Sequence, residues 1–115
     1  MNYNKVILGG NITKDIELRH TPQGTAVADF NIAVNRVWIK DGNKETEVSF
    51  IGCVAWGKTA EAISKYFTKG SPIFVEGRLK QETWEKEGKK QSKTKVIVEN
   101  FQFVESKKED NDWGQ

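Results

Sequence analysis

The chain has 115 residues, a length that fits one domain with its own core. Its 18 Lys and Arg against 16 Asp and Glu give a formal net charge of only +2, which at first argues against a nucleic-acid partner. One cysteine excludes an intrachain disulfide, and one histidine excludes a Cys/His-type metal site within one chain. No apolar run is long enough to span a bilayer and no secretion signal opens the chain, so we expect a cytoplasmic protein.

The first expected strand covers residues 5–12, whose β-branched and apolar side chains occur on both faces. This pattern predicts a strand that is covered on both sides. The Gly9-Gly10 pair predicts a bulge or a sharp bend within it. Thr21-Pro22-Gln23-Gly24 then has the residues of a type I turn.

A second expected strand begins at Ala26, because residues alternate with a period of two over the next ten positions. It continues through Trp38 to Asp41-Gly42-Asn43, which signals a hairpin turn. The pattern predicts a half-buried strand. Its expected core residues are Ala26, Ala28, Phe30, Ile32 and Val34.

The third expected strand, residues 47–56, has no polar face. One apolar face contains Ile51, Cys53 and Ala55. The opposite face carries the large aromatic side chains and consists of Val48, Phe50, Val54 and Trp56. One face is therefore expected to meet the core, and the role of the other is left open.

The period then changes to that of a helix, the only one that we expect. Thr59 is the expected N-cap, Gly70 ends the helix, and Pro72 prevents its continuation. The residues that share the expected buried face are Ala60, Ile63, Tyr66 and Phe67.

Two more strands are expected after the helix. The fourth strand spans residues 73–84, and a charged loop over residues 85–93 leads to a last strand from Val96 to Phe103. One face of the fourth strand carries Ile73, Val75 and Leu79, and the other carries Phe74, Arg78, Lys80 and Trp84. Residues from Glu105 on are polar, and we expect them to be disordered.

This order of elements predicts an all-β protein of the OB-fold class, a five-stranded Greek-key barrel with one helix between the third and fourth strands. Such barrels bind oligonucleotides or oligosaccharides on their middle strands and loops. We find no internal repeat and no second domain. Residues 1–104 are therefore the expected domain, and residues 105–115 are a short acidic tail.

The sequence gives little support for an enzyme. His20 stands before the predicted turn and is interpreted as a surface residue, and Cys53 lies on the apolar face of its strand as a small buried side chain. The carboxylates form no recognisable catalytic pair. Gly9-Gly10 lacks the Lys-Ser/Thr ending that a phosphate-binding loop requires.

Four aromatic residues are the candidate binding residues. Each lies on the strand face opposite the core alternation or at a strand end near a loop, and they are Trp38, Phe50, Trp56 and Trp84. The plainer interpretation, strongest for Phe50 and Trp56, is a second small core or a subunit interface. Basic residues beside Trp38 and Trp84 favour a single-stranded nucleic acid, because bases stack on the rings while cations follow the phosphates.

The charge distribution supports a basic surface. Residues 80–95 hold six Lys and three Glu, a net charge of +3, whereas residues 105–115 hold four acidic and two basic residues, a net charge of −2. Residues 1–104 therefore carry +4. By itself the lysine-rich segment would be interpreted as a solvated hairpin. It supports nucleic-acid binding only because it lies beside Trp84.

Several stretches together resemble the bacterial-type single-stranded DNA-binding proteins, in that family's order and spacing over about residues 4–104. They are Asn4-Lys5-Val6-Ile7-Leu8-Gly9-Gly10-Asn11-Ile12, Thr21-Pro22-Gln23-Gly24, Ala26-Val27-Ala28, Trp56-Gly57-Lys58-Thr59-Ala60-Glu61, Lys69-Gly70-Ser71 and Val75-Glu76-Gly77-Arg78-Leu79. The resemblance implies an OB barrel that assembles as a homotetramer wrapped by single-stranded DNA, with no cofactor and no reaction.

The resemblance also implies roles for individual residues. The family's stacking positions fall on Trp38, Phe50, Trp56 and Trp84. Its phosphate-contacting positions fall at or near Lys5, Lys58, Lys69 and Lys80, to which charge and placement add Arg36 and Arg78. The implied function is sequence-independent binding and protection of single-stranded DNA during replication, recombination and repair, in the cytoplasm and at the nucleoid of a bacterial cell.

Three questions stay open at this point. Family members end in a long linker and an acidic tip that recruits replication and repair proteins. Residues 105–115 contain acidic residues but almost no linker. This short tail is interpreted as a truncation, a phage or plasmid version, or a minimal tip. A protein-interaction module of the primosome type and an RNA-binding protein are the alternative functions. The strand Val6–Leu8 is either a subunit interface or a fully buried barrel strand.

Overall fold

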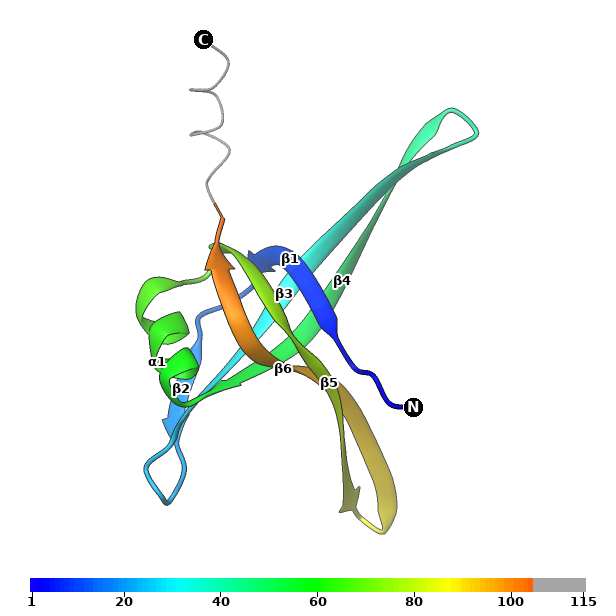
Figure 1. The fold of residues 1–115 in the computed structure, drawn as a ribbon. Coiled ribbons are helices and arrows are strands. Elements are labelled where there is room, and N and C mark those ends of the chain that lie inside the picture. The colour runs from blue at the N-terminus through cyan, green and yellow to red at the C-terminus, as the bar shows by residue number, and fades with distance from the viewer. Residues whose placement is uncertain (105–115) are drawn as a thin grey trace.

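Within residues 1–104, five strands form a closed barrel, a short extra strand pairs alongside it, and a single helix lies between β4 and β5 (Figure 1). The computed structural model describes residues 1–104, and the tail that was expected to be disordered lies outside them. The elements are β1 (Val6–Ile12), β2 (Glu17–His20), β3 (Ala26–Lys40), β4 (Asn43–Trp56), α1 (Gly57–Tyr66), β5 (Pro72–Lys86) and β6 (Lys89–Phe103).

The strand order is β1-β5-β6-β4-β3-β2, and an additional pairing between β1 and β3 closes the barrel. All neighbours are antiparallel except β4 and β6, which pair in parallel at Cys53–Val96 and Val54–Ile97. The predicted OB-fold barrel and the position of its helix are confirmed. The short strand β2 was not expected, because its four residues are all exposed and show no alternation.

The core is formed where the inner faces of the strands meet α1. Ala26, Ala28, Phe30 and Ile32 are buried, which confirms the alternation predicted for β3. Cys53 and Ala55 lie opposite these residues on β4. From α1, Ala60, Ile63 and the following Phe67 complete the same buried cluster.

A bulge in β6 sets which residues of the last strand face inward. Glu76 pairs with Asn100 and Gly77 pairs with Val98, so Glu99 is the extra residue. The parity of the inward residues therefore changes, from Val96 and Val98 before the bulge to Phe101 after it. A Cβ atom at Gly77 would collide with the backbone of Ile97, so only glycine fits at this position.

The structure corrects two expectations for β1. Of the bulge or sharp bend expected at Gly9-Gly10, the bulge is wrong, since β1 pairs with β5 without interruption from Val6 to Asn11. Gly10 is instead needed for close approach, because a Cβ atom there would collide with the Ala33 carbonyl where β1 meets β3. The strand is also not covered on both sides within one chain, because the Ile7 side chain is 56% exposed.

The helix differs from its prediction at both ends. It begins at Gly57 after Trp56, whose side chain makes no capping hydrogen bond, so Thr59 lies inside the first turn and is not the cap. It ends at Tyr66, and the Phe67 N–H donates to the Ile63 carbonyl at 3.0 Å. Tyr66 is exposed, because Ile63 and Phe67, four residues apart, already define the buried face.

The charged loop predicted for residues 85–93 is wrong, because β5 and β6 continue as a ribbon to Lys86 and Lys89. Glu87 and Gly88 have φ values of 53° and 77°, and Asp41 and Gly42 have 52° and 80°. Positive φ at both central residues is typical of the two-residue hairpin turns that suit twisted strands. The predicted hairpin at residues 41–43 is thus present, and the β3–β4 and β5–β6 hairpins project as two arms (Figure 1).

We expect Gly77→Ala to lower the free energy of unfolding by about 1–3 kcal/mol, because the new methyl group must displace backbone atoms of β6. Gly52→Ala is the matched control: its Cβ atom would lie 3.5 Å from Asn31 Oδ1, an ordinary contact, so stability should stay equal or rise. Urea unfolding followed by tryptophan fluorescence measures both. Equal stability of the two variants would contradict the role given to Gly77.

Candidate nucleic-acid interface

Strands β3, β4, β6 and β5 share a surface on the side away from the core, called here the outer face. Strand parity and register assign its residues. They are Val27, Asp29 and Asn31 of β3; Phe50, Gly52, Val54 and Trp56 of β4; Lys93, Lys95 and Ile97 of β6; and Arg78, Lys80, Glu82 and Trp84 of β5.

Phe50 and Trp56 are exposed on this face, by 69% and 47% respectively. These values exclude the interpretation that either belongs to the core of this chain. Trp56 ends β4 and precedes α1, and in the β3–β4 register it lies opposite Val27. Val27, Val54 and Ile97 form a small second buried cluster, which supports the outer face beside Trp56.

An open groove brings Trp56 together with Arg78 and Lys80, which come from a strand far along the sequence. Its volume is about 540 Å³, and it is also lined by Thr59, Ile97, Val98 and Glu99. Arg78 Nε lies 3.4 Å from Glu99 Oε2. Within residues 1–104 Lys80 forms no ion pair, so its ammonium group is available beside an exposed indole.

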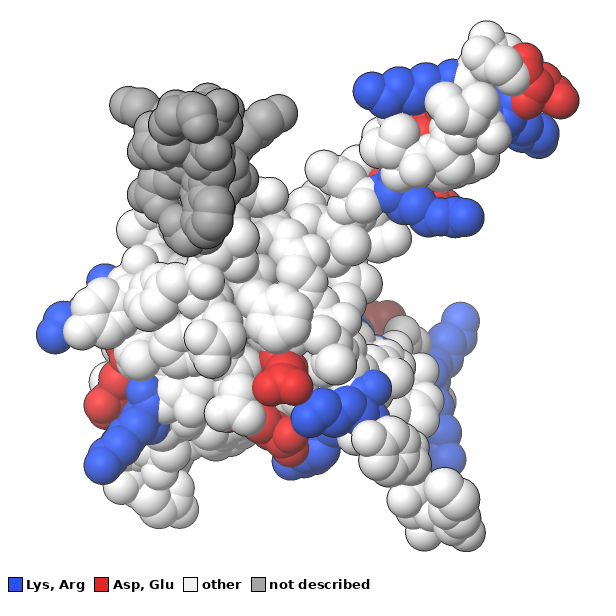
Figure 2. Space-filling model, turned by 45° about the horizontal axis from the view of Figure 1, so that its top comes forward, with Lys and Arg blue, Asp and Glu red and all other residues white. Residues whose placement is uncertain are grey.

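Trp84 stands on the β5–β6 arm, opposite Gln91, and is 45% exposed. Its parity along β5 is that of Arg78 and Lys80, as the sequence predicted. Further lysines occupy the same arm, and Figure 2 shows Lys and Arg side chains on both projecting arms. The outer face thus carries three of the four predicted aromatic residues.

Trp38 does not share that face. The β3–β4 register is unbroken, with Ala33 opposite Phe50 and Trp38 opposite Glu45, so Trp38 and Phe50 project from opposite faces of the β3–β4 arm. Trp38 is half-buried, and the Arg36 guanidinium carbon lies 4.8 Å from its ring centroid, a cation–π contact. Arg36 also lies 3.9 Å from Glu47.

The six predicted phosphate-contacting residues divide into two groups. Lys5 pairs with Glu76 at 3.4 Å, while Arg36 and Arg78 have the acidic partners given above. Lys58 in the first turn of α1, Lys69 in the loop before β5, and Lys80 have no ion pair within the described part of the chain. Exposed ion pairs contribute little stability, so phosphates can replace the acidic partners at small cost.

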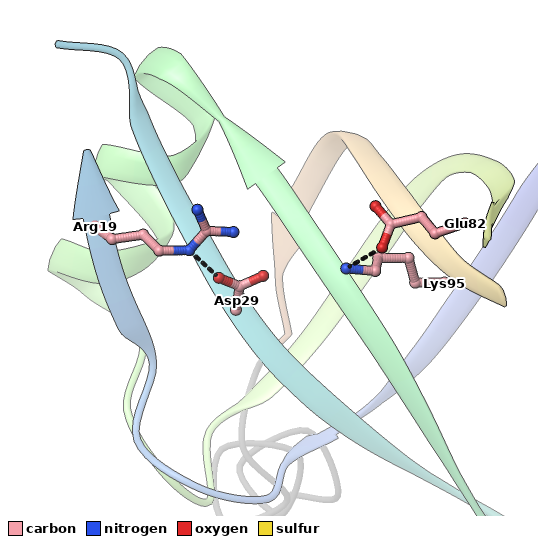
Figure 3. Close-up of polar contacts among 4 residues, drawn as sticks. All are labelled: Arg19, Asp29, Glu82 and Lys95. Atoms are coloured by element: carbon pink, nitrogen blue, oxygen red, sulfur yellow. Dashed lines mark hydrogen bonds and ion pairs between the residues drawn. The ribbon is translucent and has the colours of Figure 1, made fainter. Parts of the chain in front are cut away.

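Sequence reasoning missed a polar hollow on the outer face. It has a volume of about 250 Å³ and is lined by Lys14, Glu17, Asp29, Phe30, Asn31, Gly52, Cys53, Lys93 and Lys95. Figure 3 shows two of its charged groups with their partners: Arg19 Nε lies 2.9 Å from Asp29 Oδ2, and Lys95 Nζ lies 3.0 Å from Glu82 Oε1. The only sequence signal for this hollow was a glycine, Gly52, in the middle of a strand.

The residues considered for catalysis are placed apart from one another. His20 is exposed at the end of β2, and Cys53 is buried in the core cluster, where its thiol faces the Ile51 carbonyl at 3.7 Å. Burial raises the pKa of the Cys53 thiol from 9.0 to about 12, which disfavours a thiolate nucleophile. Residues 1–104 contain no group of three His, Cys, Asp or Glu side chains that could hold a metal ion.

We expect Cys53 to react with a thiol reagent at pH 8 only after unfolding. Because its folded pKa lies above its unfolded pKa, the neutral thiol's contribution to stability is complete below pH 9 and is lost as the pH rises towards 12. Thiol titration with and without denaturant measures the reactivity of Cys53, and rapid labelling of the native protein would contradict its burial.

Urea unfolding at pH 8 and pH 10 measures the pH dependence of stability. Between these two pH values the wild type should lose more stability than Cys53→Ala.

Residues 3–104 match the model of the Single-strand binding protein family. A single-stranded DNA-binding protein of Wolinella succinogenes is 48% identical over 107 residues, covering 91% of this chain and 66% of the relative. Single-stranded DNA-binding protein 3 of Listeria innocua is 47% identical over 105 residues, covering 90% and 65%. The chain thus spans just under two thirds of these relatives.

Two solved structures share the fold. A deletion mutant of the single-stranded DNA binding protein from Thermus aquaticus superposes with a TM-score of 0.81 at 33% identity, covering 91% of this chain and 52% of that one. A Plasmodium falciparum SSB complex with ssDNA gives a TM-score of 0.83 at 21% identity, covering 91% and 97%, a likeness of fold alone. No helix in residues 1–104 has the length and apolar character needed to cross a membrane.

Proposed function

The chain belongs to the single-strand binding protein family, and on that premise we propose that it binds single-stranded DNA without sequence specificity and protects it. The observation that carries the proposal is the outer face, where Phe50, Trp56 and Trp84 are exposed around the basic residues Arg78 and Lys80. The relatives are named for DNA binding and for no reaction, so the function is binding, not catalysis.

Two kinds of contact would hold the strand. Bases stack on the exposed rings, each stack contributing about 1–3 kcal/mol whatever the base, since every base has a π-face. Cations bind the phosphates, and Lys58, Lys69 and Lys80 are free for this role in the described chain. Lys5, Arg36 and Arg78 would exchange their exposed acidic partners for phosphates. Trp38 would stack a base on the other face of its arm.

The remaining assignments follow from this role. Residues 1–104 form the DNA-binding domain, and residues 105–115 are a short acidic tail. The protein acts in replication, recombination and repair, in the cytoplasm of a bacterial cell where single-stranded DNA is exposed. Its named relatives from bacteria support this placement.

A homotetramer is part of the proposal, and β1 is its candidate interface. Along Val6–Gly10, one edge of β1 pairs with β5, and within residues 1–104 the other edge has no strand partner. Ile7 projects from this segment with 56% exposure. An unpaired edge strand with an exposed apolar side chain is a surface on which another chain can add a strand.

We expect the wild type to bind a 35-mer of dT with tryptophan quenching, and Trp84→Ala to weaken binding about fivefold to a hundredfold. Log affinity should fall linearly with log salt, by about 0.7 for each phosphate neutralised. Lys80→Gln should reduce that slope by about 0.7, whereas Trp84→Ala leaves it unchanged. Fluorescence titrations over a salt series measure both quantities.

The control for this titration is Tyr66→Leu, which removes an exposed aromatic residue of α1 that is not on the outer face. It should bind like the wild type. No quenching with dT would exclude the proposed function and favour a protein-interaction module. Tighter binding of oligo-U than of dT in competition would assign RNA as the partner, because stacking does not read the 2′-hydroxyl.

We expect sedimentation to give the mass of a tetramer for the wild type and a smaller species for Ile7→Glu, because a buried unpaired carboxylate is costly at an interface. Val37→Glu introduces the same charge at an exposed apolar residue of the β3–β4 arm and serves as the control. A monomeric wild type, or an unchanged mass in Ile7→Glu, would exclude β1 as the interface.

A further inference from the structure

Gly52 is a glycine that the fold does not need. Of the nine glycines described, five have positive φ, and at Gly10 and Gly77 a Cβ atom would collide with backbone. Gly9 and Gly52 are the two exceptions. At Gly52 the nearest atom to an added Cβ is Asn31 Oδ1 at 3.5 Å, an ordinary contact.

A glycine in the middle of a strand destabilises it by roughly 0.5–1 kcal/mol relative to alanine. Gly52 lies in the middle of β4, between Ile51 and Cys53, which both pack with the core cluster. Where no backbone constraint requires the glycine, such a position often marks the close approach of a ligand. The consequence of the missing side chain here is the polar hollow of about 250 Å³ on the outer face.

The hollow lies on the line between two exposed aromatic residues. Phe50, Gly52 and Trp56 share one face of β4, and strands rise about 3.4 Å per residue, so Phe50 and Trp56 stand about 20 Å apart with Gly52 about 7 Å from Phe50. A DNA strand whose bases stack on both rings therefore passes over Gly52.

The polar groups of the hollow suit one nucleotide of the bound DNA strand. The Asn31 side-chain amide, beside Gly52, makes no hydrogen bond within residues 1–104, so both its donor and its acceptor are available. Lys14 and Lys93 also line the hollow and have no ion pair among those residues. The Asp29 carboxylate is paired with Arg19, which lessens its repulsion of a phosphate. Glu17 is the one lining carboxylate without such a pair in the described chain.

We propose that the hollow over Gly52 seats one nucleobase of the bound strand, whose edge hydrogen-bonds to the Asn31 amide. The proposal rests on the proposed DNA-binding function and adds to it a contact that is not aromatic stacking. Because an amide offers both a donor and an acceptor, the seat accepts different bases. Lys14 and Lys93 hold the flanking phosphates.

The test compares Gly52→Leu, which fills the hollow, with Asn31→Leu, which keeps the size of the side chain and removes its hydrogen bonds. Both should bind a 35-mer of dT about threefold to tenfold more weakly than the wild type, the range expected for one lost hydrogen-bonded contact. Ser49→Leu adds the same side chain to an exposed position on the opposite face of β4 and should leave affinity unchanged. Urea unfolding verifies that each variant is folded.

A 35-mer without bases tests whether a base or the sugar–phosphate backbone occupies the hollow. On abasic DNA, measured at low salt, Gly52→Leu should bind like the wild type, because no base remains to be excluded. An equal loss on both oligonucleotides would overturn the proposal in favour of a sugar–phosphate contact, and no loss on dT would also overturn it. Failure of the wild type itself to bind dT would reject the proposed function, which is a different result.

Discussion

The outer face depends on one short parallel contact between β4 and β6. Only Cys53–Val96 and Val54–Ile97 pair there, yet this contact joins the β3–β4 hairpin to the β5–β6 hairpin. It places Trp56 of the first hairpin beside Arg78 and Lys80 of the second. The bulge at Glu99 lies just beyond this contact. Val98 before it and Phe101 after it both face the core, which fixes the contact in register.

Charge on this face is arranged locally, and the net charge of +2 does not describe it. Asp29 and Glu82 would repel a polyanion, but Arg19 and Lys95 lie within 3.0 Å of their carboxylates. Such exposed pairs add little to stability. Their effect is on the potential near the surface, because they cancel the acidic groups while Lys80 and Lys93, which have no ion pair in the described chain, still attract phosphates.

Features that follow from the alternation or helical period of one segment could be predicted from the sequence. Features that depend on how strands pair with one another could not. The inner face of β3 and, except for Tyr66, the buried face of α1 were predicted, because a buried strand or helix face must be apolar at a fixed spacing. The loop expected at residues 85–93 was wrong because charged residues occupy exposed ribbons as readily as loops. The N-cap at Thr59 was wrong because the extended Trp56 already begins the helix. The β3–β4 register was needed to decide which aromatic residues share a face.

That register also bears on the path of the DNA. A strand that follows Phe50 and Trp56 along β4 meets one face of the β3–β4 arm, and Trp38 projects from the other. To contact all three rings within one chain, it must pass around an edge of the arm. Arg36 covers one face of the Trp38 ring, so a base must stack on the free face or displace the guanidinium. A displaced Arg36 would be available to a phosphate, which makes Trp38 and Arg36 a coupled pair in binding.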